Sequence, residues 1–262
     1  MYRQVNKLLW LLPLIFCFIG QSSATADTDR NIVRLTTGEW PPYTSSHMAA
    51  SGIGSQVVSE AFRLAGYEVE YGFFPWKRSY RLAVNGKWDG SIIWQRTPER
   101  ARKLLFSDPV VMVKNVFFHH KDDPFDWNNL ADLKGRRVGT TRGYAYGPDF
   151  RAELARLQID RADSDSDLIN LNLLLKGRID VFPIDIHVGH YLIARNFRPG
   201  EAELFAFHPR PLTPAPLFLV LAKSLPRSLE LVEAFNDGLK KLRQSGRYQE
   251  ILSENLPSNG KQ

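Results

Sequence analysis

Residues 164–183 read SDSDLINLNLLLKGRIDVFP. The leucines that share one face of a helix here are Leu168, Leu171, Leu174 and Leu175. Ser164 is suited to cap the first turn of this helix, and Gly177 is suited to end it. The apolar run at 179–183 then predicts a strand. A helix that leads directly into a strand is the basic step of an α/β fold.

The same step repeats along the rest of the chain. Strands are predicted at 31–37, 67–74, 88–94, 110–118, 136–141, 179–183 and 217–222. Helices are predicted at 57–65, 76–84, 97–103, 148–157, 164–176, 186–195, 228–242 and 248–252. Strands that alternate with helices of this length favour open, mainly parallel sheets flanked by helices.

The repeated pattern falls into two runs, which predicts two lobes. The long apolar strand at 110–118 and the proline-rich segment at 208–216 are the natural crossing points between them. We therefore expect residues 27–113 and 214–262 to form the first lobe and residues 114–213 the second. Two such lobes bring loops from the carboxyl ends of their strands to a shared cleft, where ligands of α/β proteins usually bind.

The first 26 residues have the pattern of a secretory signal peptide. Arg3 and Lys7 precede an apolar run at 8–20, and Ala24 and Ala26 stand where a signal peptidase reads small residues. A membrane anchor is the alternative, but a run of about 13 residues is shorter than the ~20 that span a bilayer. Lipid attachment at Cys17 is disfavoured because Phe16 precedes it.

Composition excludes several other classes of protein. The chain has 262 residues, 44% of them hydrophobic, with a formal net charge of +6 and a single cysteine. These values exclude a disordered chain, a collagen-like repeat and a disulfide-stapled miniprotein. No block of lysine and arginine is present, so we expect no nucleic-acid partner.

Four ordered motifs make the chain resemble the family-3 periplasmic solute-binding proteins of ABC importers. TPER at 97–100 is followed by FSDP at 106–109, and EWPPY stands at 39–43. LKGRRVG at 133–139 leads to RGY at 142–144, and GRID at 177–180 leads to Asp185. The resemblance implies a two-lobe periplasmic-binding-protein fold with two crossover segments.

The resemblance also implies a function. A small polar ligand, an amino acid or a related carboxylate, would be enclosed between the lobes and delivered to an ABC permease of the inner membrane. Such a protein acts in the periplasm, and we expect it to be a monomer with no cofactor, no metal and no catalytic residues. His187 and His190 have a spacing that suits a metal, but no third ligand stands out.

The same resemblance assigns candidate ligand-binding residues. Arg100 matches the arginine that holds a ligand carboxylate, which suits the paired donors of a guanidinium. Trp40 and Trp76 match aromatic residues that enclose the ligand, and a ring face also attracts a cation. Asp185 matches the acid that pairs with a ligand ammonium, although aspartate at this place also suits a helix N-cap.

Further candidates lie beside these residues. Arg142 and Tyr144 are on a loop between a strand and a helix that can present backbone N–H groups to an anion. Trp94 and Gln95 end the strand before Arg100 and are expected to line the cleft.

Two departures from the family keep other functions open. IWQR at 93–96 replaces the small hydroxyl residues usual in amino-acid binders, and GIGSQ at 52–56 replaces their usual acidic motif. One alternative is a periplasmic enzyme such as cyclohexadienyl dehydratase, in which Arg100 would hold the carboxylate and Asp185 would transfer protons. The other is an orphan sensory module without a transporter.

Overall fold

The computed structural model describes residue 1 and residues 31–147, 149–212 and 214–255. The predicted signal peptide, including Cys17, lies outside the described residues apart from Met1. The described residues between 32 and 255 form one compact unit. No helix within the described ranges is both long and apolar enough to cross a membrane.

Two five-stranded sheets are built on the same plan. The first has the order β2-β1-β3-β10-β4, with β1 Ile32–Thr37, β2 Glu68–Phe73, β3 Gly90–Trp94, β4 Leu104–Val113 and β10 Ala215–Ala222. The second has the order β7-β6-β8-β5-β9, with β5 Asn115–His120, β6 Val138–Thr141, β7 Arg161–Ser164, β8 Val181–Asp185 and β9 Phe205–Pro211. In each sheet the fourth strand runs antiparallel to both neighbours, and the first three strands are parallel. The prediction of mainly parallel sheets is confirmed.

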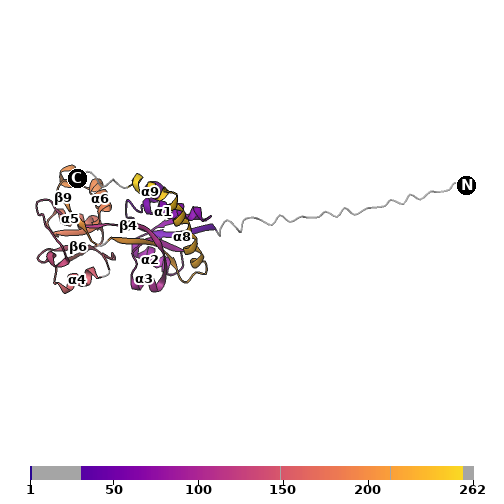
Figure 1. The fold of residues 1–262 in the computed structure, drawn as a ribbon, viewed down its shortest axis with the longest axis horizontal. Coiled ribbons are helices and arrows are strands. Elements are labelled where there is room, and N and C mark those ends of the chain that lie inside the picture. The colour runs from indigo at the N-terminus through magenta and orange to yellow at the C-terminus, as the bar shows by residue number, and fades with distance from the viewer. Residues whose placement is uncertain (2–30, 148, 213, 256–262) are drawn as a thin grey trace. The chain divides into compact units, whose positions relative to one another are not determined.

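Helices flank both sheets (Figure 1). Those around the first sheet are α1 Ile53–Leu64, α2 Trp76–Val84, α3 Pro98–Lys103, α8 Ser228–Gln244 and α9 Arg247–Asn255, with the short helix η2 Ala49–Ser51. Those around the second are α4 Phe150–Arg156, α5 Asp167–Leu175, α6 Ile186–Asn196 and α7 Pro199–Ala202, with η3 Leu130–Leu133. We call the first sheet with its helices and loops the first lobe, and the second set the second lobe.

The prediction of a single strand at 110–118 was wrong. Its apolar residues belong to two strands, β4 and β5, which Lys114 separates and which lie in different sheets. Periodicity could not reveal this break because the residues on both sides of Lys114 are mostly apolar and show no alternation with polar residues. The lobe boundaries at 113/114 and 213/214 stay a prediction, and the chain changes sheet at both places.

Helix α5 begins later than its sequence suggested. Ser166, not Ser164, is the N-cap, and its side chain accepts a hydrogen bond from the backbone N–H of Ile169. Ser164 instead ends β7, a strand that the sequence analysis missed, as it missed β9. The short strand β7 carries Asp163 and Arg161 among few apolar residues, so its pattern did not stand out from a loop.

Close packing fixes the helices on their sheets. In the first lobe, the rings of Phe62 on α1 and Phe235 on α8 are 5.2 Å apart. Gly238 on α8 lies so close to α1 that an added Cβ would be 1.9 Å from the carbonyl oxygen of Ala61. In the second lobe, Gly189 on α6 packs on the ring of Phe118 on β5. These contacts fix α1 against α8 in the first lobe and α6 against β5 in the second.

Candidate functional site

The predicted ligand-binding residues lie where parallel strands end. Trp40 follows β1, Gln95 and Arg100 follow β3, Tyr144 follows β6, and Asp185 ends β8. The carboxyl ends of parallel strands share one edge of a sheet, which is the usual ligand position in open α/β sheets. Both lobes therefore present candidate ligand-binding side chains from equivalent edges.

Arg100 is held half-buried at the first lobe. Its Nη1 donates to the backbone oxygen of Gln95 at 2.9 Å, and its guanidinium lies 4.8 Å from the centre of the Trp94 ring. Its Nη2 reaches across to the second lobe and donates to the backbone oxygen of Gly143 at 3.3 Å. Burial lowers the pKa of Arg100. In the part of the chain that the structure describes, Arg100 forms no ion pair with a carboxylate.

Three aromatic side chains support Arg100 in the first lobe. The Trp94 ring is 7% exposed and donates through Nε1 to Ser91 Oγ at 2.7 Å. Trp76 meets Trp94 edge-on, with ring centres 5.2 Å apart, and Tyr80 lies 5.5 Å from Trp94. The Nε1 of Trp76 is buried and has no hydrogen-bond partner among the described residues. These rings give the first lobe an aromatic wall with a cation at its edge.

A strained residue precedes Trp94. Ile93 has a φ of 66°, a left-handed conformation that β-branched residues rarely adopt and that costs about 1–3 kcal/mol. The pairing of β3 with β10 shifts register between Phe218 and Val220, opposite this point. Such a bulge changes the direction of the side chains that follow it. It therefore contributes to the placement of Trp94 under Arg100.

The EWPPY loop of the first lobe extends to the second lobe. The rings of Trp40 and Tyr43 stack with centres 4.9 Å apart. Trp40 Nε1 donates to Asp167 Oδ2 at 3.2 Å, and the Tyr43 hydroxyl donates to Asp185 Oδ1 at 3.2 Å. One loop thus contacts two buried carboxylates of the other lobe.

Asp167 stands at the first turn of α5 and is 5% exposed. Besides Trp40, it accepts hydrogen bonds from Thr141 Oγ1 at 2.6 Å and from the Tyr144 hydroxyl at 3.3 Å. Burial raises the pKa of Asp167 to about 6, the nearby charge of Asp185 adds to the increase, and the three hydrogen bonds oppose it. This carboxyl group can therefore change protonation near neutral pH.

Asp185 is 1% exposed and has four hydrogen-bond donors. It caps α6 by accepting from the backbone N–H groups of His187 at 3.0 Å and Val188 at 3.2 Å. Lys114 at the first crossover donates its backbone N–H to Oδ2 at 2.9 Å, and Tyr43 is the fourth donor. Burial raises the pKa of Asp185. The N-cap role that the sequence allowed is therefore present, while its contact with a ligand stays a prediction.

The structure brings most of the predicted residues together but not all. Trp40, Tyr144 and Asp185 join one cluster between the lobes, and Trp76, Trp94, Gln95 and Arg100 form another on the first lobe. The bond from Arg100 to Gly143, the neighbour of Tyr144, links the two clusters. The Arg142 side chain lies apart, exposed and paired with Asp165.

Sequence reasoning missed Tyr43 and Asp167. Tyr43 stood within the quoted EWPPY motif, but no separate role was given to it. Asp167 carried a signal of its own, because it precedes Leu171 and Leu174 by four and seven residues and so lies on the buried face of the helix. A carboxylate on a buried face needs partners and often marks a site.

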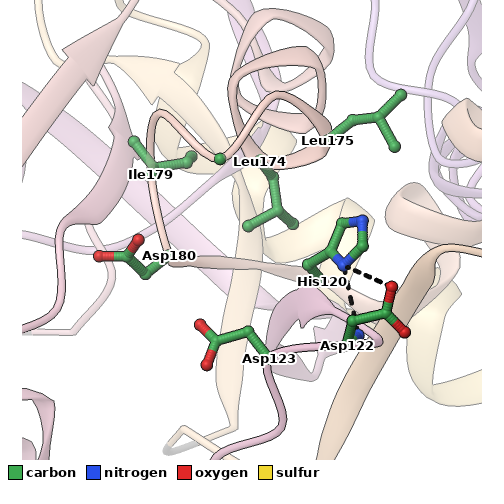
Figure 2. Close-up of a pocket in the computed structure, with 8 residues that line it drawn as sticks. His120, Asp122, Asp123, Leu174, Leu175, Ile179 and Asp180 are labelled. Carbon is green, nitrogen blue, oxygen red and sulfur yellow. Dashed lines mark hydrogen bonds and ion pairs between the residues drawn. The ribbon is translucent and has the colours of Figure 1, made fainter.

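A hollow on the surface of the second lobe lies away from both clusters. It has a volume of about 320 Å³ and is lined by His120, Asp122, Asp123, Leu174, Leu175, Gly177, Ile179 and Asp180 (Figure 2). Its acids already have partners, since Asp123 pairs with Arg136 and Asp180 with Arg137. Nowhere in the described ranges do three metal-ligating side chains gather in a way that could hold a metal ion. This hollow shares no residue with the two clusters described above.

Comparisons with known proteins agree with this α/β architecture of two five-stranded sheets flanked by helices. The sequence profile of the bacterial extracellular solute-binding proteins, family 3, matches residues 32–257. The chain therefore belongs to this family. No curated protein sequence matches it significantly.

Solved structures show the same fold at low sequence identity. A histidine kinase sensor domain similar to periplasmic binding proteins has a TM-score of 0.73 and 23% identity, over 87% of this chain and 96% of the other. An ancestral arginine-binding protein bound to arginine has a TM-score of 0.72 and 21% identity, over 87% and 99%. An ancestral amino acid-binding protein described as a precursor of cyclohexadienyl dehydratase has a TM-score of 0.68 and 19% identity, over 87% and 96%.

Proposed function

We propose that this protein binds a small polar solute with an anionic group between its two lobes, in the periplasm, and delivers it to an ABC permease of the inner membrane. Arg100 carries this proposal. It is a half-buried cation whose partners among the described residues are two carbonyl oxygens and a ring face, without a carboxylate. A carboxylate ligand would supply the missing charge through a bidentate pair.

The opposite side of the site supports a ligand that also carries a positive group. Asp167 and Asp185 are buried acids of the second lobe, and neither has a lysine or arginine partner among the described residues. Trp40, Tyr43 and Tyr144 surround them with aromatic rings. An amino acid or related zwitterion would match a guanidinium on one wall and carboxylates on the other.

The binding free energy that these groups can provide is sufficient for a transport protein. One hydrogen bond to a charged group contributes about 1.5–3 kcal/mol. Micromolar affinity requires about 8 kcal/mol in total. The guanidinium, the carboxylates and the aromatic rings together can provide this after the cost of closing the lobes.

The test is a thermal-shift screen of the chain from residue 27, with amino acids, opines, polyamines and small organic acids. A ligand raises the melting temperature by mass action. We expect Arg100→Ala to weaken binding at least about tenfold, or 1.4 kcal/mol, and to shift the melting temperature of the free protein by no more than a few degrees. Arg102→Ala, an exposed arginine on the same helix, is the matched control. Unchanged affinity in Arg100→Ala with a large loss of stability would show that Arg100 has only a structural role.

Delivery to a permease needs a separate test. Deletion of the gene should abolish cellular uptake of the solute found in the screen, and the wild-type gene should restore it. Normal uptake after deletion would instead favour a sensory module, as in the kinase sensor domain of similar fold.

A second candidate function is a periplasmic dehydratase. Asp167 favours it, because a carboxyl group with a pKa of about 6 is suited to proton transfer near neutral pH. The fold is also similar to that of the precursor of cyclohexadienyl dehydratase. Incubation with arogenate or prephenate distinguishes the two functions, because steady formation of phenylalanine or phenylpyruvate would replace the binding proposal.

A further inference from the structure

The two oxygens of the Asp167 carboxylate have different surroundings. Oδ1 is held within the second lobe by Thr141 Oγ1, which in turn accepts a hydrogen bond from Asn170 Nδ2 at 3.0 Å. Oδ2 faces Trp40 of the first lobe and Tyr144 of the second. Oδ1 therefore fixes the carboxylate on its own lobe, whereas Oδ2 is shared between a donor from each lobe.

The contact between Trp40 and Asp167 is sensitive to the position of the lobes. Among the described residues, no lysine, arginine or histidine forms an ion pair with Asp167. If the lobes moved apart, the carboxylate would exchange the indole N–H for water. Closing them replaces that water with an indole donor held in place by the protein, and the resulting charge-assisted hydrogen bond favours the close spacing. Loss of either partner removes this contribution, so we expect the lobes to shift toward a wider spacing.

The second contact of the same loop depends less on the lobes. Asp185 retains three backbone donors of its own, from His187, Val188 and Lys114, when Tyr43 is taken away. Asp167 would retain two side-chain donors, of which the Tyr144 bond is long at 3.3 Å. Of the two carboxylates, Asp167 is thus the one whose hydrogen bonding depends more on the first lobe.

We propose that Asp167 is a positioning residue of the ligand site, which holds the Trp40 indole against the second lobe and so sets the spacing of the lobes that a ligand meets. The relevance of that spacing to a ligand rests on the proposed function. The contact joins two side chains of the protein itself, and it can be measured in ligand-free protein. Asp167 acts through Trp40, whose ring also meets Tyr144 edge-on at 6.4 Å.

The test measures the lobes directly in ligand-free protein. Spin labels are attached at Arg102→Cys on α3 and Asp149→Cys at the start of α4, in the chain from residue 27, which has no cysteine of its own. Distances between the labels are measured by double electron–electron resonance in the wild type, Asp167→Asn, Asp167→Ala and Trp40→Phe. Asp165→Asn is the matched control. It also removes one negative charge, two residues from Asp167, but the Asp165 side chain is exposed.

We expect one short distance in the wild type and in Asp165→Asn, and a shift to longer distances in Trp40→Phe and Asp167→Ala. Asp167→Asn keeps an oxygen acceptor and should shift less. In parallel, the indole N–H resonance of Trp40, assigned by its loss in Trp40→Phe, should move in Asp167→Asn and stay in Asp165→Asn.

Three results would overturn the proposal. They are equal distances in the wild type and Asp167→Ala, a shift in Asp167→Ala without one in Trp40→Phe, and an unmoved Trp40 resonance in Asp167→Asn. If Asp167→Ala does not fold, Trp40→Phe tests the same contact from the other lobe. A protein that passes these tests but binds nothing in the ligand screen would contradict the proposed function alone.

Discussion

The two lobes share a strand order but differ in the chemistry at their strand ends. The first lobe presents a guanidinium on an aromatic wall, at Arg100, Trp94 and Trp76. The second presents two buried carboxylates, Asp167 and Asp185, at the beginnings of α5 and α6. The common plan fixes where loops meet, whereas side chains on those loops decide the charge that each lobe offers. A ligand bound between them, as proposed above, would meet opposite charges from two similar scaffolds.

The largest expected effect is on the free energy of unfolding, and it comes from two glycine substitutions that compare the packing of the two lobes. Gly238→Ala in the first lobe should lower the free energy of unfolding by about 3 kcal/mol or more, because the new Cβ meets the backbone oxygen of Ala61. Gly189→Ala in the second lobe should cost about 1 kcal/mol, because it meets only the Phe118 side chain, 2.6 Å away. Urea unfolding measures both. Equal losses would show that both lobes accommodate a methyl group to the same degree.

The next effect concerns the buried charge of the second lobe. The pKa of Asp167 is raised from 3.8 to about 6, so the folded protein binds more protons than the unfolded chain between these values. Stability from this group therefore increases as the pH falls from 7 to 4, by up to about 2–3 kcal/mol. The difference in unfolding free energy between the wild type and Asp167→Asn should grow in favour of the wild type over this range.

Other buried groups with shifted pKa values are common to both proteins. Burial raises the pKa of Asp185 and lowers those of His187 and His190. Their contributions largely cancel when the variant is subtracted from the wild type at each pH. A difference that does not change between pH 7 and pH 4 would contradict the shifted pKa of Asp167.

A smaller effect separates the two carboxylates. Asp185→Ala removes the N-cap of α6 and leaves the backbone N–H of Lys114 without its acceptor, so it should cost about 2 kcal/mol. Asp185→Asn should cost less, because asparagine also caps helices. Thermal and urea unfolding test this order. If both substitutions were neutral, the capping role of Asp185 would be excluded.

The smallest expected effect concerns Arg142, the predicted site residue whose side chain lies apart from both clusters. Arg142 forms an exposed ion pair with Asp165, so Arg142→Ala should change stability by less than about 1 kcal/mol. If the loop meets an anion through its backbone, ligand affinity should remain within about twofold of the wild type. A tenfold loss, about 1.4 kcal/mol, would place the Arg142 side chain itself at the ligand.

Much of the fold could be predicted because its helices and central strands have clear periodic patterns. The helix at 76–84 was predicted with the bounds that the structure has, since Pro75 precedes it and Gly86 follows it. The strands β7 and β9 were missed because they are short or contain polar residues and proline. The break at Lys114 was missed because it interrupts a continuous apolar run.

The site was only partly predictable, for a different reason. Motifs identified Arg100, Trp40 and Asp185 because each belongs to an ordered family pattern. Asp167 belongs to none of the quoted motifs, and its importance comes from side chains that are distant in sequence. Trp40, for example, is separated from it by 127 positions. Pairing across lobes of this kind is a property of the folded chain and leaves only an indirect mark, an acid on an otherwise buried helix face.

The position of β10 within its sheet has a consequence for the order in which the chain folds. This strand lies between β3 and β4, yet it comes from residues 215–222, after the whole second sheet. As the chain emerges, β5 to β9 are complete before β4 acquires its neighbour. The second half of the molecule can thus assemble first, while the first half must wait, with an unpaired edge, for the last quarter of the polypeptide.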